Sequence, residues 1–525
     1  MSVMRYVWEP CVSLPAARRA VALGVFDGLH CGHRAVISAA CGVADKNGQL
    51  LTATVLSMTG VPKNGLGGLL TPKREAQLLE TLGADEWIAL PFEAVHRLSP
   101  EEFVRKILCE QLQAHAVCCG YNYRFGNGGV GTADTLRQLC EPLGIAVTVI
   151  PSVQRDGKEI SSTHVRQALA EGDMPQAAAL LGRPFAVEFP VTDGDHRGRR
   201  WGMPTLNQIF PSGYAVPRYG VYASLVSVNG KQYRAVTNIG VHPTVGNVPC
   251  PQAETWIQEF DGTLYGQTVQ VMLIRFLRDE QRFDGVETLK AQITADAAHA
   301  VSVLGGDGGH AVIFDFDDTL QDRTPAFCAA AAWLLKRHMP QADDQTRADY
   351  VRQLWAENNG GYVDYDAFFE SAAAKLPFED GVTGEQLLWE FRRIFPACSV
   401  LFPETEAVLK QLREKGYRIG ILTNGNSLVQ NRKLDITGVR LYVDLAVVSG
   451  DEPLQKPNPE LFRRVAERLC VSPENCVFVG DHPRNDIDGA LDAGMKAIFL
   501  NTRRLDVHPN GVPEVSRLSD VLPLL

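Results

Sequence analysis

Residues 24–37, GVFDGLHCGHRAVI, decide the fold of the first part of this chain, because an apolar strand pattern passes here directly into a helical one. Strands that alternate with helices build parallel sheets. The turn between the strand and the helix carries Asp27, Gly28, His30 and His33. We therefore expect these residues at the carboxyl edge of a sheet, where doubly wound folds bind ligands.

The same rhythm continues after this turn. Short apolar runs at residues 50–58, 86–92, 115–121 and 145–153 each stand between amphipathic stretches. This alternation predicts a series of βαβ units, which we assign to a first domain of residues 1–183.

The pattern changes near residue 184, where closely spaced strands with turn residues replace the long helical stretches. Within residues 218–240, Asn229 and Gly230 stand between two alternating runs. An Asn-Gly pair in this position is typical of a type I′ hairpin turn. We predict a small antiparallel barrel over residues 184–303.

A glycine-rich segment, LGGDGGH at residues 304–310, is expected to be a linker. The apolar strand AVIFDF follows it, and the alternation of strands and helices resumes after about residue 400. Residues 311–525 are therefore predicted to form a doubly wound domain, with a helix-rich insert at about 325–400 as a cap.

The composition is that of an ordinary globular protein. The 525 residues exceed what one hydrophobic core accommodates, and 45% are hydrophobic and 21% charged. A net charge of −10 without a long Lys/Arg run argues against nucleic acid as a partner. No secretory signal and no membrane-spanning apolar stretch are recognisable, and the cysteines are scattered, so we expect a cytoplasmic protein with reduced thiols and no membrane partner.

Two histidines three residues apart at the start of a helix suit the phosphates of ATP. The backbone N–H groups of the helix start attract anions, and the glycines of the turn allow close approach. Such chemistry needs charge stabilisation more than a covalent nucleophile. Two alternatives are structural histidines and a metal site made from His30, His33 and Asp27.

The string GVFDGLHCGH resembles the HxGH signature of the prokaryotic bifunctional riboflavin kinase/FAD synthetase family. Residues 120–136, GYNYRFGNGGVGTADTL, resemble its second adenylyltransferase motif, and residues 159–185 its third. The resemblance implies that the first domain adenylylates FMN with ATP, using His30, His33 and Asn122 as catalytic residues. By the same resemblance the nucleotide and its phosphates are bound by Gly24, Phe26, Asp27, Gly28, Gly32, Ser161, Ser162, Thr163 and Arg166.

Residues 194–207, GDHRGRRWGMPTLN, resemble the riboflavin kinase signature of the same family, and further family motifs follow in order up to about residue 296. The resemblance implies that Glu254 takes the proton from the riboflavin 5′-hydroxyl while Mg²⁺ and ATP are held nearby. It also implies nucleotide contacts from Gly194, Gly198, Arg199, Thr205 and Asn207, the last two of which also bind Mg²⁺. A simple Thr-Asn turn remains the alternative for the end of this motif.

Three positions depart from the usual pattern of the kinase domain. Trp201 and Met203 replace the common Leu and Phe, and Trp256 stands where His is frequent. The sequence leaves their effect on flavin binding open.

The strand-ending string VIFDFDDTL at residues 312–320 gathers three acids, which are costly to bury without a cation. It resembles the first motif of the haloacid dehalogenase-like hydrolases, and the other three motifs follow in order. The resemblance implies a phosphatase in which Asp315 is the nucleophile and Asp317 the general acid and base. It further implies catalytic roles for Thr423 and Lys456, and a Mg²⁺ site formed by Asp315, Asp317, Asp481 and Asp486.

Together these patterns predict an α/β multidomain chain: a Rossmann-like nucleotidyltransferase, a six-stranded-type antiparallel β-barrel of the riboflavin kinase kind, and a doubly wound haloacid dehalogenase-like domain with a helical cap. The expected substrates are ATP, riboflavin, FMN and a phosphorylated ribityl compound. For the phosphatase we weigh the phosphorylated ribitylamino-pyrimidine precursor of riboflavin, FMN itself, and general nucleotide or sugar phosphates. A non-enzymatic alternative keeps one domain only as a flavin-binding sensor.

Overall fold

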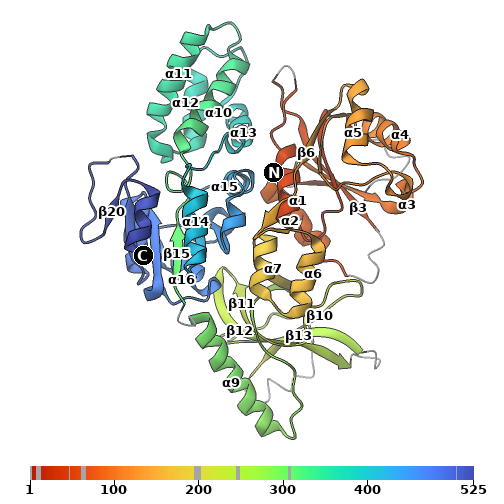
Figure 1. The fold of residues 1–525 in the computed structure, drawn as a ribbon, viewed down its shortest axis with the longest axis vertical. Helices are drawn as coiled ribbons and strands as arrows, with labels where there is room; N and C mark the ends of the chain where they lie inside the picture. Colours follow the sequence, from red (N-terminus) through yellow and green to blue (C-terminus); the bar gives the residue numbers. More distant parts are fainter. Residues whose placement is uncertain are drawn as a thin grey trace.

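The computed structural model describes residues 3–7, 14–45, 48–60, 67–193, 203–243, 249–305, 309–503 and 505–525 (Figure 1). It contains two parallel sheets and, between them in the sequence, a closed antiparallel barrel. The predicted fold class is therefore confirmed. None of the helices in the described ranges has the length and apolar character needed to cross a membrane.

The first sheet has six parallel strands in the order β1-β4-β3-β2-β5-β6. The chain places β3 and β4 on one side of β2, and β5 and β6 on the other. The order reverses between β2 and β5, which is the switch point at which such sheets bind ligands. The strands are β1 (Met4–Val7), β2 (Arg19–Gly24), β3 (Thr52–Thr59), β4 (Glu86–Pro91), β5 (Ala114–Gly120) and β6 (Ala146–Ile150).

Helices and one small hairpin complete this region. Local sequence sets the ends of α2: Thr71 caps it, Pro72 takes its first position, and Gly83 ends it with a φ of +86°. The elements are α1 (Cys31–Ala40), α2 (Pro72–Leu82), α3 (Phe92–Val95), α4 (Pro100–Glu102), η1 (Phe103–Gln111), η2 (Asn127–Gly129), α5 (Ala133–Cys140), η3 (Glu141–Leu143), β7 (Gln154–Arg155), β8 (Lys158–Glu159), α6 (Ser162–Glu171) and α7 (Met174–Leu181).

The barrel closes in the order β10-β13-β12-β11-β14-β9. The predicted hairpin is confirmed: Val228 pairs with Lys231, and Asn229 and Gly230 between them have φ values of +50° and +78°, as a type I′ turn requires. The strands are β9 (Phe185–Thr192), β10 (Thr205–Ile209), β11 (Gly220–Val228), β12 (Lys231–Pro243), β13 (Pro249–Ile257) and β14 (Thr268–Arg278).

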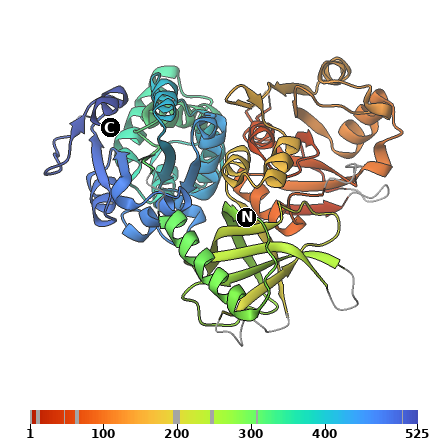
Figure 2. The ribbon, with the colours of Figure 1, turned by 60° about the horizontal axis from the view of Figure 1, so that its bottom comes forward.

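A long helix, α9 (Val286–Gly305), leads from the barrel to the third domain (Figure 2). Its Ala297, Ala300 and Leu304 pack against barrel residues such as Val221. The helix continues to residue 305, so the segment that we expected to be a linker from 304 begins inside it. The packing of Leu304 explains this difference, because a buried side chain holds the last turn against the barrel.

The second parallel sheet has the order β17-β16-β15-β18-β19-β20. Its first strand, β15, is again central, with the next two strands on one side and the last three on the other. The switch point therefore lies between β15 and β18. The strands are β15 (Ala311–Phe314), β16 (Arg418–Thr423), β17 (Leu445–Val448), β18 (Cys476–Gly480), β19 (Lys496–Leu500) and β20 (Glu514–Val515).

Four helices inserted after β15 form a separate apolar cluster above this sheet, centred on Phe327, Phe391 and Phe395 (Figure 1). We call this helical insert the cap. Its helices are α10 (Arg323–His338), α11 (Asp344–Glu357), α12 (Tyr365–Lys375) and α13 (Gly384–Ala397), with the short turn η4 (Asn359–Gly361). The sheet itself is flanked by α14 (Thr405–Glu414), α15 (Ser427–Ile436), η5 (Val439–Tyr442), η6 (Ser449–Asp451), α16 (Pro459–Arg468), η7 (Pro473–Asn475), η8 (Pro483–Asp488), α17 (Gly489–Asp492) and η9 (Leu518–Leu524).

The third domain contacts both of the others (Figures 1 and 2). Helix α15 packs against α1 and α2 of the first domain. The barrel is joined to α16 by Gln232 and Arg234, which both bind Glu467 at 2.9 Å. The first domain, the barrel and the third domain thus form one connected assembly.

Candidate active sites

His30 and His33 lie at the start of α1, directly after the central strand of the first sheet. His30 is the N-cap residue, and its Nδ1 accepts the backbone N–H of His33 at 3.3 Å. The two rings are stacked with centroids 3.6 Å apart. Burial, reinforced by the charge of Arg183, lowers the pKa of His30 to about 4, and burial lowers that of His33 well below its usual range. Both imidazoles are therefore neutral at pH 7.

The third expected motif meets the first at Asp27. Arg166 forms an ion pair with the Asp27 carboxylate, whose other oxygen accepts the backbone N–H of Leu69 at 2.9 Å. Ser162 donates to the Asp27 carbonyl at 2.7 Å. Ser161 caps α6 by accepting the N–H of His164, and Thr163 lies exposed in the first turn of that helix.

The turn before α1 is tightly shaped. Phe26 is buried with a φ of +46° and meets the ring of His33 edge-on. Gly28 has a φ of +86°, and a Cβ there would lie 2.7 Å from Leu69. A Cβ on Gly24 would meet the ring of Phe26 at 2.8 Å, and one on Gly32 would lie 3.1 Å from the ring of His30.

The second motif reaches the third through one carboxylate. Asn122 donates to Glu159 at 3.3 Å, and the neighbouring Tyr121 hydroxyl donates to the same oxygen at 2.6 Å. Glu159 is the first residue of the third motif, yet it was not predicted to be a site residue. Its position two residues before Ser161 could have drawn attention to it, but the spacing along the chain does not predict its hydrogen bond with Asn122.

In the barrel, the proposed kinase residues face one another across two strands. Asn207 is directly opposite Glu254, and Thr205 is opposite Trp256, in the antiparallel pairing of β10 and β13. Opposite residues in such a pair lie on the same face of the sheet. Glu254 also accepts a hydrogen bond from Gln252 at 2.7 Å. Met203 is described, whereas Gly194, Gly198, Arg199 and Trp201 lie outside the described residues.

Two of the acids of the third domain meet the same lysine just beyond the carboxyl end of β15. Lys456 Nζ lies 2.6 Å from Asp315 and 2.7 Å from Asp486, and all three side chains are buried. Burial raises the pKa of Asp315 to about 7, although Lys456 opposes the shift. Burial and the two neighbouring carboxylates also raise the pKa of Asp481.

This cluster has the geometry of a cation site. One oxygen each from Asp315, Asp481 and Asp486 lie within 4.8 Å of one another. Within the described ranges this is the one group of three such side chains whose ligand atoms lie this close together, and His30, His33 and Asp27 do not make such a group. Hard carboxylate oxygens suit Mg²⁺, and a cation there would relieve the repulsion that raises the carboxyl pKa values.

The carboxylate of Asp317 does not join this group, which differs from our expectation that it is a metal ligand. Lys433 Nζ contacts both of its oxygens, at 2.9 and 3.0 Å, and Gln430 donates to one of them at 3.0 Å. Burial opposes ionisation of Asp317, but Lys433 and Arg323 together lower its pKa. The physical reason for the difference is this buried lysine, which competes for the carboxylate.

Helix α15 therefore supplies two site residues that the sequence reading missed. Gln430 also donates to Thr423 Oγ1 at 2.7 Å, so it bridges Asp317 and the second hydrolase motif, ILTNGN at residues 421–426. Gln430 and Lys433 are three residues apart on the helix that follows this motif, and this spacing on one helix face was the available signal. Asn424 joins the second hydrolase motif to the third, residues 455–462, because it exchanges two 2.9 Å hydrogen bonds with the backbone of Lys456.

A cavity of about 360 Å³ adjoins the acid cluster, between the cap and the core of the third domain. Arg503 forms part of its wall and lies 3.0 Å from Asp481. Tyr362 from the cap meets His482 edge-on, with ring centroids 4.7 Å apart. Its complete lining is Asn359, Gly360, Tyr362, His482, Pro483, Arg503, Leu505 and Val507.

Three known protein families match successive parts of the chain. Residues 14–164 match the FAD synthetase family, residues 181–304 the riboflavin kinase family, and residues 310–494 the haloacid dehalogenase-like hydrolases. Fold, sites and matches define a multidomain enzyme that joins transferase domains to a hydrolase domain.

Within that class, the chain belongs to the bifunctional riboflavin kinase/FMN adenylyltransferase family. It is 33% identical over 295 residues to the Bacillus subtilis protein of that name, covering 54% of this chain and 92% of the relative. The Pseudomonas fluorescens protein is 34% identical over 303 residues, covering 56% and 96%. A solved structure described as a macrolide-efflux protein from Streptococcus pneumoniae is 29% identical, with a TM-score of 0.51, and covers 57% of this chain and 99% of that one.

These matches also show what is added in this chain. About half of it spans nearly the whole of each curated relative. Those relatives therefore have no room for a domain like residues 311–525. The hydrolase domain, and every contact that it makes with the first domain, is an addition to the bifunctional core.

Proposed function

We propose that the third domain is a Mg²⁺-dependent phosphatase, with Asp315 as the nucleophile that takes up the phosphoryl group. The observation that carries this proposal is the contact of Lys456 with both Asp315 and Asp486, beside Asp481. A bound Mg²⁺ would neutralise charge on the transferring phosphoryl group. Lys456 adds positive charge, and Thr423 donates to a phosphate oxygen.

Asp317 is placed for proton transfer in this scheme. Its protonated form, the minor one beside Lys433, gives its proton to the leaving alkoxide as the Asp315–phosphate bond forms and the ester P–O bond breaks. The resulting carboxylate then takes a proton from the water that hydrolyses the aspartyl-phosphate, which restores the protonated form. The buried partners Lys433 and Gln430 hold its carboxylate in one orientation. Asp486, fixed by the lysine that also binds Asp315, supports the metal site.

For the substrate we favour the phosphorylated ribitylamino-pyrimidine precursor of riboflavin. Loss of its phosphate supplies riboflavin synthesis and hence the kinase, whereas an FMN phosphatase would hydrolyse the product of the kinase and consume ATP in a cycle. The cavity supports a leaving group with a flat ring, since Tyr362 and His482 offer aromatic surfaces and Arg503 offers donors for ring oxygens.

In the flavin half, we assign adenylylation of FMN to His30, His33 and Asn122. Neutral imidazoles donate hydrogen bonds to phosphate oxygens without a change of charge, while the N-terminus of α1 attracts the anion. Arg166 and the serines of the third motif complete the phosphate site. Glu254 acts as the general base of the kinase, next to the Mg²⁺ and ATP ligands Asn207 and Thr205.

The test is a direct comparison of substrates with the full chain. Purified enzyme is given the ribitylamino-pyrimidine phosphate, FMN and a panel of sugar phosphates and nucleotides at equal concentration, and phosphate release is followed with Mg²⁺ or with excess EDTA. We expect release from the precursor to be fastest and to stop in EDTA. Faster release from FMN overturns the substrate, and a flat profile favours a general phosphatase.

A parallel incubation tests the flavin half and the non-enzymatic alternative. With riboflavin, ATP and Mg²⁺, we expect FMN to appear first and FAD to follow. A domain retained only as a flavin-binding sensor would bind flavin in this assay without producing either compound.

A further inference from the structure

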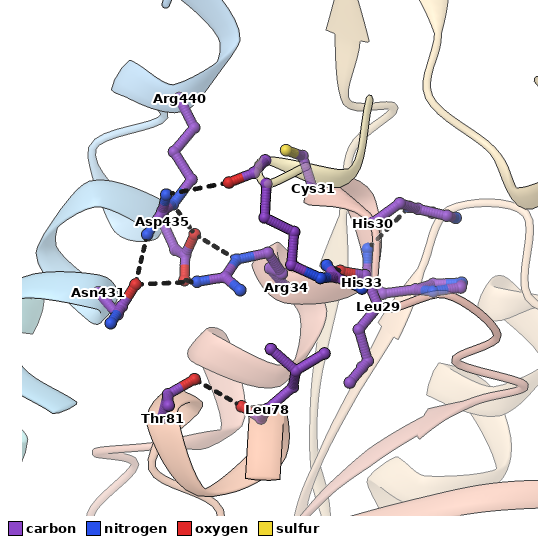
Figure 3. A network of polar contacts seen from close by, with 12 residues as sticks. Leu29, His30, Cys31, His33, Arg34, Leu78, Thr81, Asn431, Asp435 and Arg440 are labelled. Atoms are coloured by element: carbon purple, nitrogen blue, oxygen red, sulfur yellow. Dashed lines mark hydrogen bonds and ion pairs between the residues drawn. The ribbon is translucent and has the colours of Figure 1, made fainter. Parts of the chain in front are cut away.

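Helix α15 has two polar faces that serve different domains. One face directs Gln430 and Lys433 to Asp317 of the third domain. The other presents Asn431 and Asp435 to the first domain, where they meet Arg34 (Figure 3). The helix therefore stands between the proposed general acid of the phosphatase and the helix that begins at the adenylyltransferase histidines.

The contact at Arg34 is a buried two-point ion pair. Arg34 Nε and Nη2 lie 2.8 and 2.9 Å from the two oxygens of Asp435, and the side chains are 5% and 2% exposed. Arg440 binds the same carboxylate at 2.9 Å, and also reaches the Gly182 carbonyl of the first domain at 3.5 Å. Paired arginine and carboxylate groups fix direction as well as distance. Removing Arg34 would leave the buried Asp435 carboxylate with Arg440 alone and without its two-point partner from the first domain.

Close packing fixes the remainder of the same interface. Arg432 on α15 donates to the carbonyl of Cys41, which ends α1. Gly42 follows with a φ of +92°, and a Cβ there would lie 2.8 Å from the Arg393 carbonyl of the cap. At Gly83, with a φ of +86°, a Cβ would lie 2.6 Å from the Leu428 side chain. The first domain thus touches α15 along its length, at positions where only glycine fits without strain.

We propose that Arg34 of the adenylyltransferase domain is a positioning residue of the phosphatase. It holds α15 through Asp435, and α15 in turn holds Asp317 through Lys433 and Gln430. This inference rests on the proposed phosphatase and adds that its proton-transfer geometry depends on the domain fused before it. A shift of about 1 Å in a catalytic group can cost on the order of a hundredfold in rate, so a small displacement of α15 is sufficient.

The test uses Arg34→Met in the full chain, with Arg155→Met as a matched control. Arg155 is also a buried arginine of the first domain and binds Asp444 of the third at 2.7 Å, but it makes no contact with α15 among the described hydrogen bonds and ion pairs. The substrate is an alkyl phosphate: the ribitylamino-pyrimidine phosphate or FMN, whichever the wild type hydrolyses faster. We expect kcat/KM for it to fall about tenfold in Arg34→Met and to stay within about twofold of the wild type in Arg155→Met. Arg34→Lys keeps the charge without the two-point contact and should lose less.

Two further readouts separate positioning from loss of structure. Hydrolysis of p-nitrophenyl phosphate, whose leaving group needs little protonation, should fall less than that of the alkyl phosphate. In a Lys433→Met background, Arg34→Met should add no further loss, because residues that act in series are not additive. Thermal melts of each variant report on folding.

The outcomes distinguish the positioning role of Arg34 from the proposed phosphatase activity. An equal loss on both substrates, full additivity with Lys433→Met, or equal losses in Arg34→Met and Arg155→Met would overturn the positioning role and leave the phosphatase in place. A wild type that releases no phosphate from any substrate would overturn both. If Arg34→Met does not fold, Arg34→Lys and its double variant with Lys433→Met decide the question by the same criteria.

Discussion

The sheets of the first and third domains share the same order over five strands, β4-β3-β2-β5-β6 and β17-β16-β15-β18-β19, but they place different groups at the same point. In both, the first βα unit supplies the central strand, and the candidate site lies at the switch point beside it. After β2 stand two neutral histidines with Arg166 nearby, whereas after β15 stand buried acids around Lys456. The shared fold therefore places both candidate sites at the same edge of the sheet, and the residues at the strand end differ in chemistry: neutral rings in the first domain, carboxylates suited to a cation in the third.

The largest effect should come from removing the nucleophile of the third domain. We expect Asp315→Asn to lower phosphate release by about a thousandfold or more, since the amide cannot form the aspartyl-phosphate. FMN and FAD formation by the same sample should remain at wild-type rates, because no part of the first site uses Asp315. Phosphate assay and flavin chromatography on one preparation measure both. Equal losses in both halves would show that the two sites are not chemically independent.

The converse change in the first domain should have the next largest effect. His33→Ala removes a donor expected to stabilise charge in the transition state, and such losses cost about a hundredfold to a thousandfold in rate. We expect FAD formation from added FMN to fall by this amount while FMN formation from riboflavin continues. His115→Ala, which changes a histidine away from the site, is the control. If His33→Ala still synthesises FAD at the wild-type rate, His30 and His33 are structural rather than catalytic.

A smaller effect is expected where the third domain selects its substrate. Tyr362→Ala removes an aromatic wall of the cavity, and contacts of one ring contribute about 0.5–1.5 kcal/mol, up to about tenfold. We expect the ratio of kcat/KM for the ribitylamino-pyrimidine phosphate to that for ribose 5-phosphate to fall by this factor. Tyr362→Phe keeps the ring and should preserve the ratio. An unchanged ratio in Tyr362→Ala would mean that the pyrimidine ring of the substrate does not contact Tyr362.

The parts of this molecule that depend on local sequence pattern could be predicted from the sequence. Alternating apolar runs predict both sheets, and Asn229-Gly230 predicts its turn, because each follows from neighbouring residues. Motif residues at strand ends were also expected to converge, since parallel strands end at one edge, and Lys456 does meet Asp315 across 141 positions.

Contacts between domains could not be predicted from the sequence. Arg34 and Asp435 are 401 positions apart, and each lies on a helix whose pattern shows only that a face is buried, not what covers it. Lys433 was not among the predicted site residues, for the same reason. Its contact with Asp317 separates that carboxylate from the metal cluster, and spacing along the chain contains no record of such competition.

The smallest expected effect is a pH dependence of stability that has opposite sign at the two sites. The pKa of His30 is about 4 in the folded chain and 6.5 in its ordinary state, so the unfolded chain binds more protons between these values. Its contribution to stability is therefore complete above pH 6.5 and declines as the pH falls. At pH 5.5 this amounts to about 1 kcal/mol, or a shift of about 2–4 °C in melting temperature.

Asp315 should act in the other direction. Its folded pKa is about 7 against an ordinary 3.8, so the folded chain binds more protons between these values, and acidification within that window stabilises it. Melting curves of the wild type, His30→Gln and Asp315→Asn from pH 7.5 to 5.5, in EDTA to exclude cations, measure the two contributions. On acidification, the melting temperature of His30→Gln should fall less than that of the wild type, and the melting temperature of Asp315→Asn should fall more. Parallel curves for all three proteins would mean that burial does not set the charge of either site, and would remove the electrostatic basis of the contrast between the two sheets.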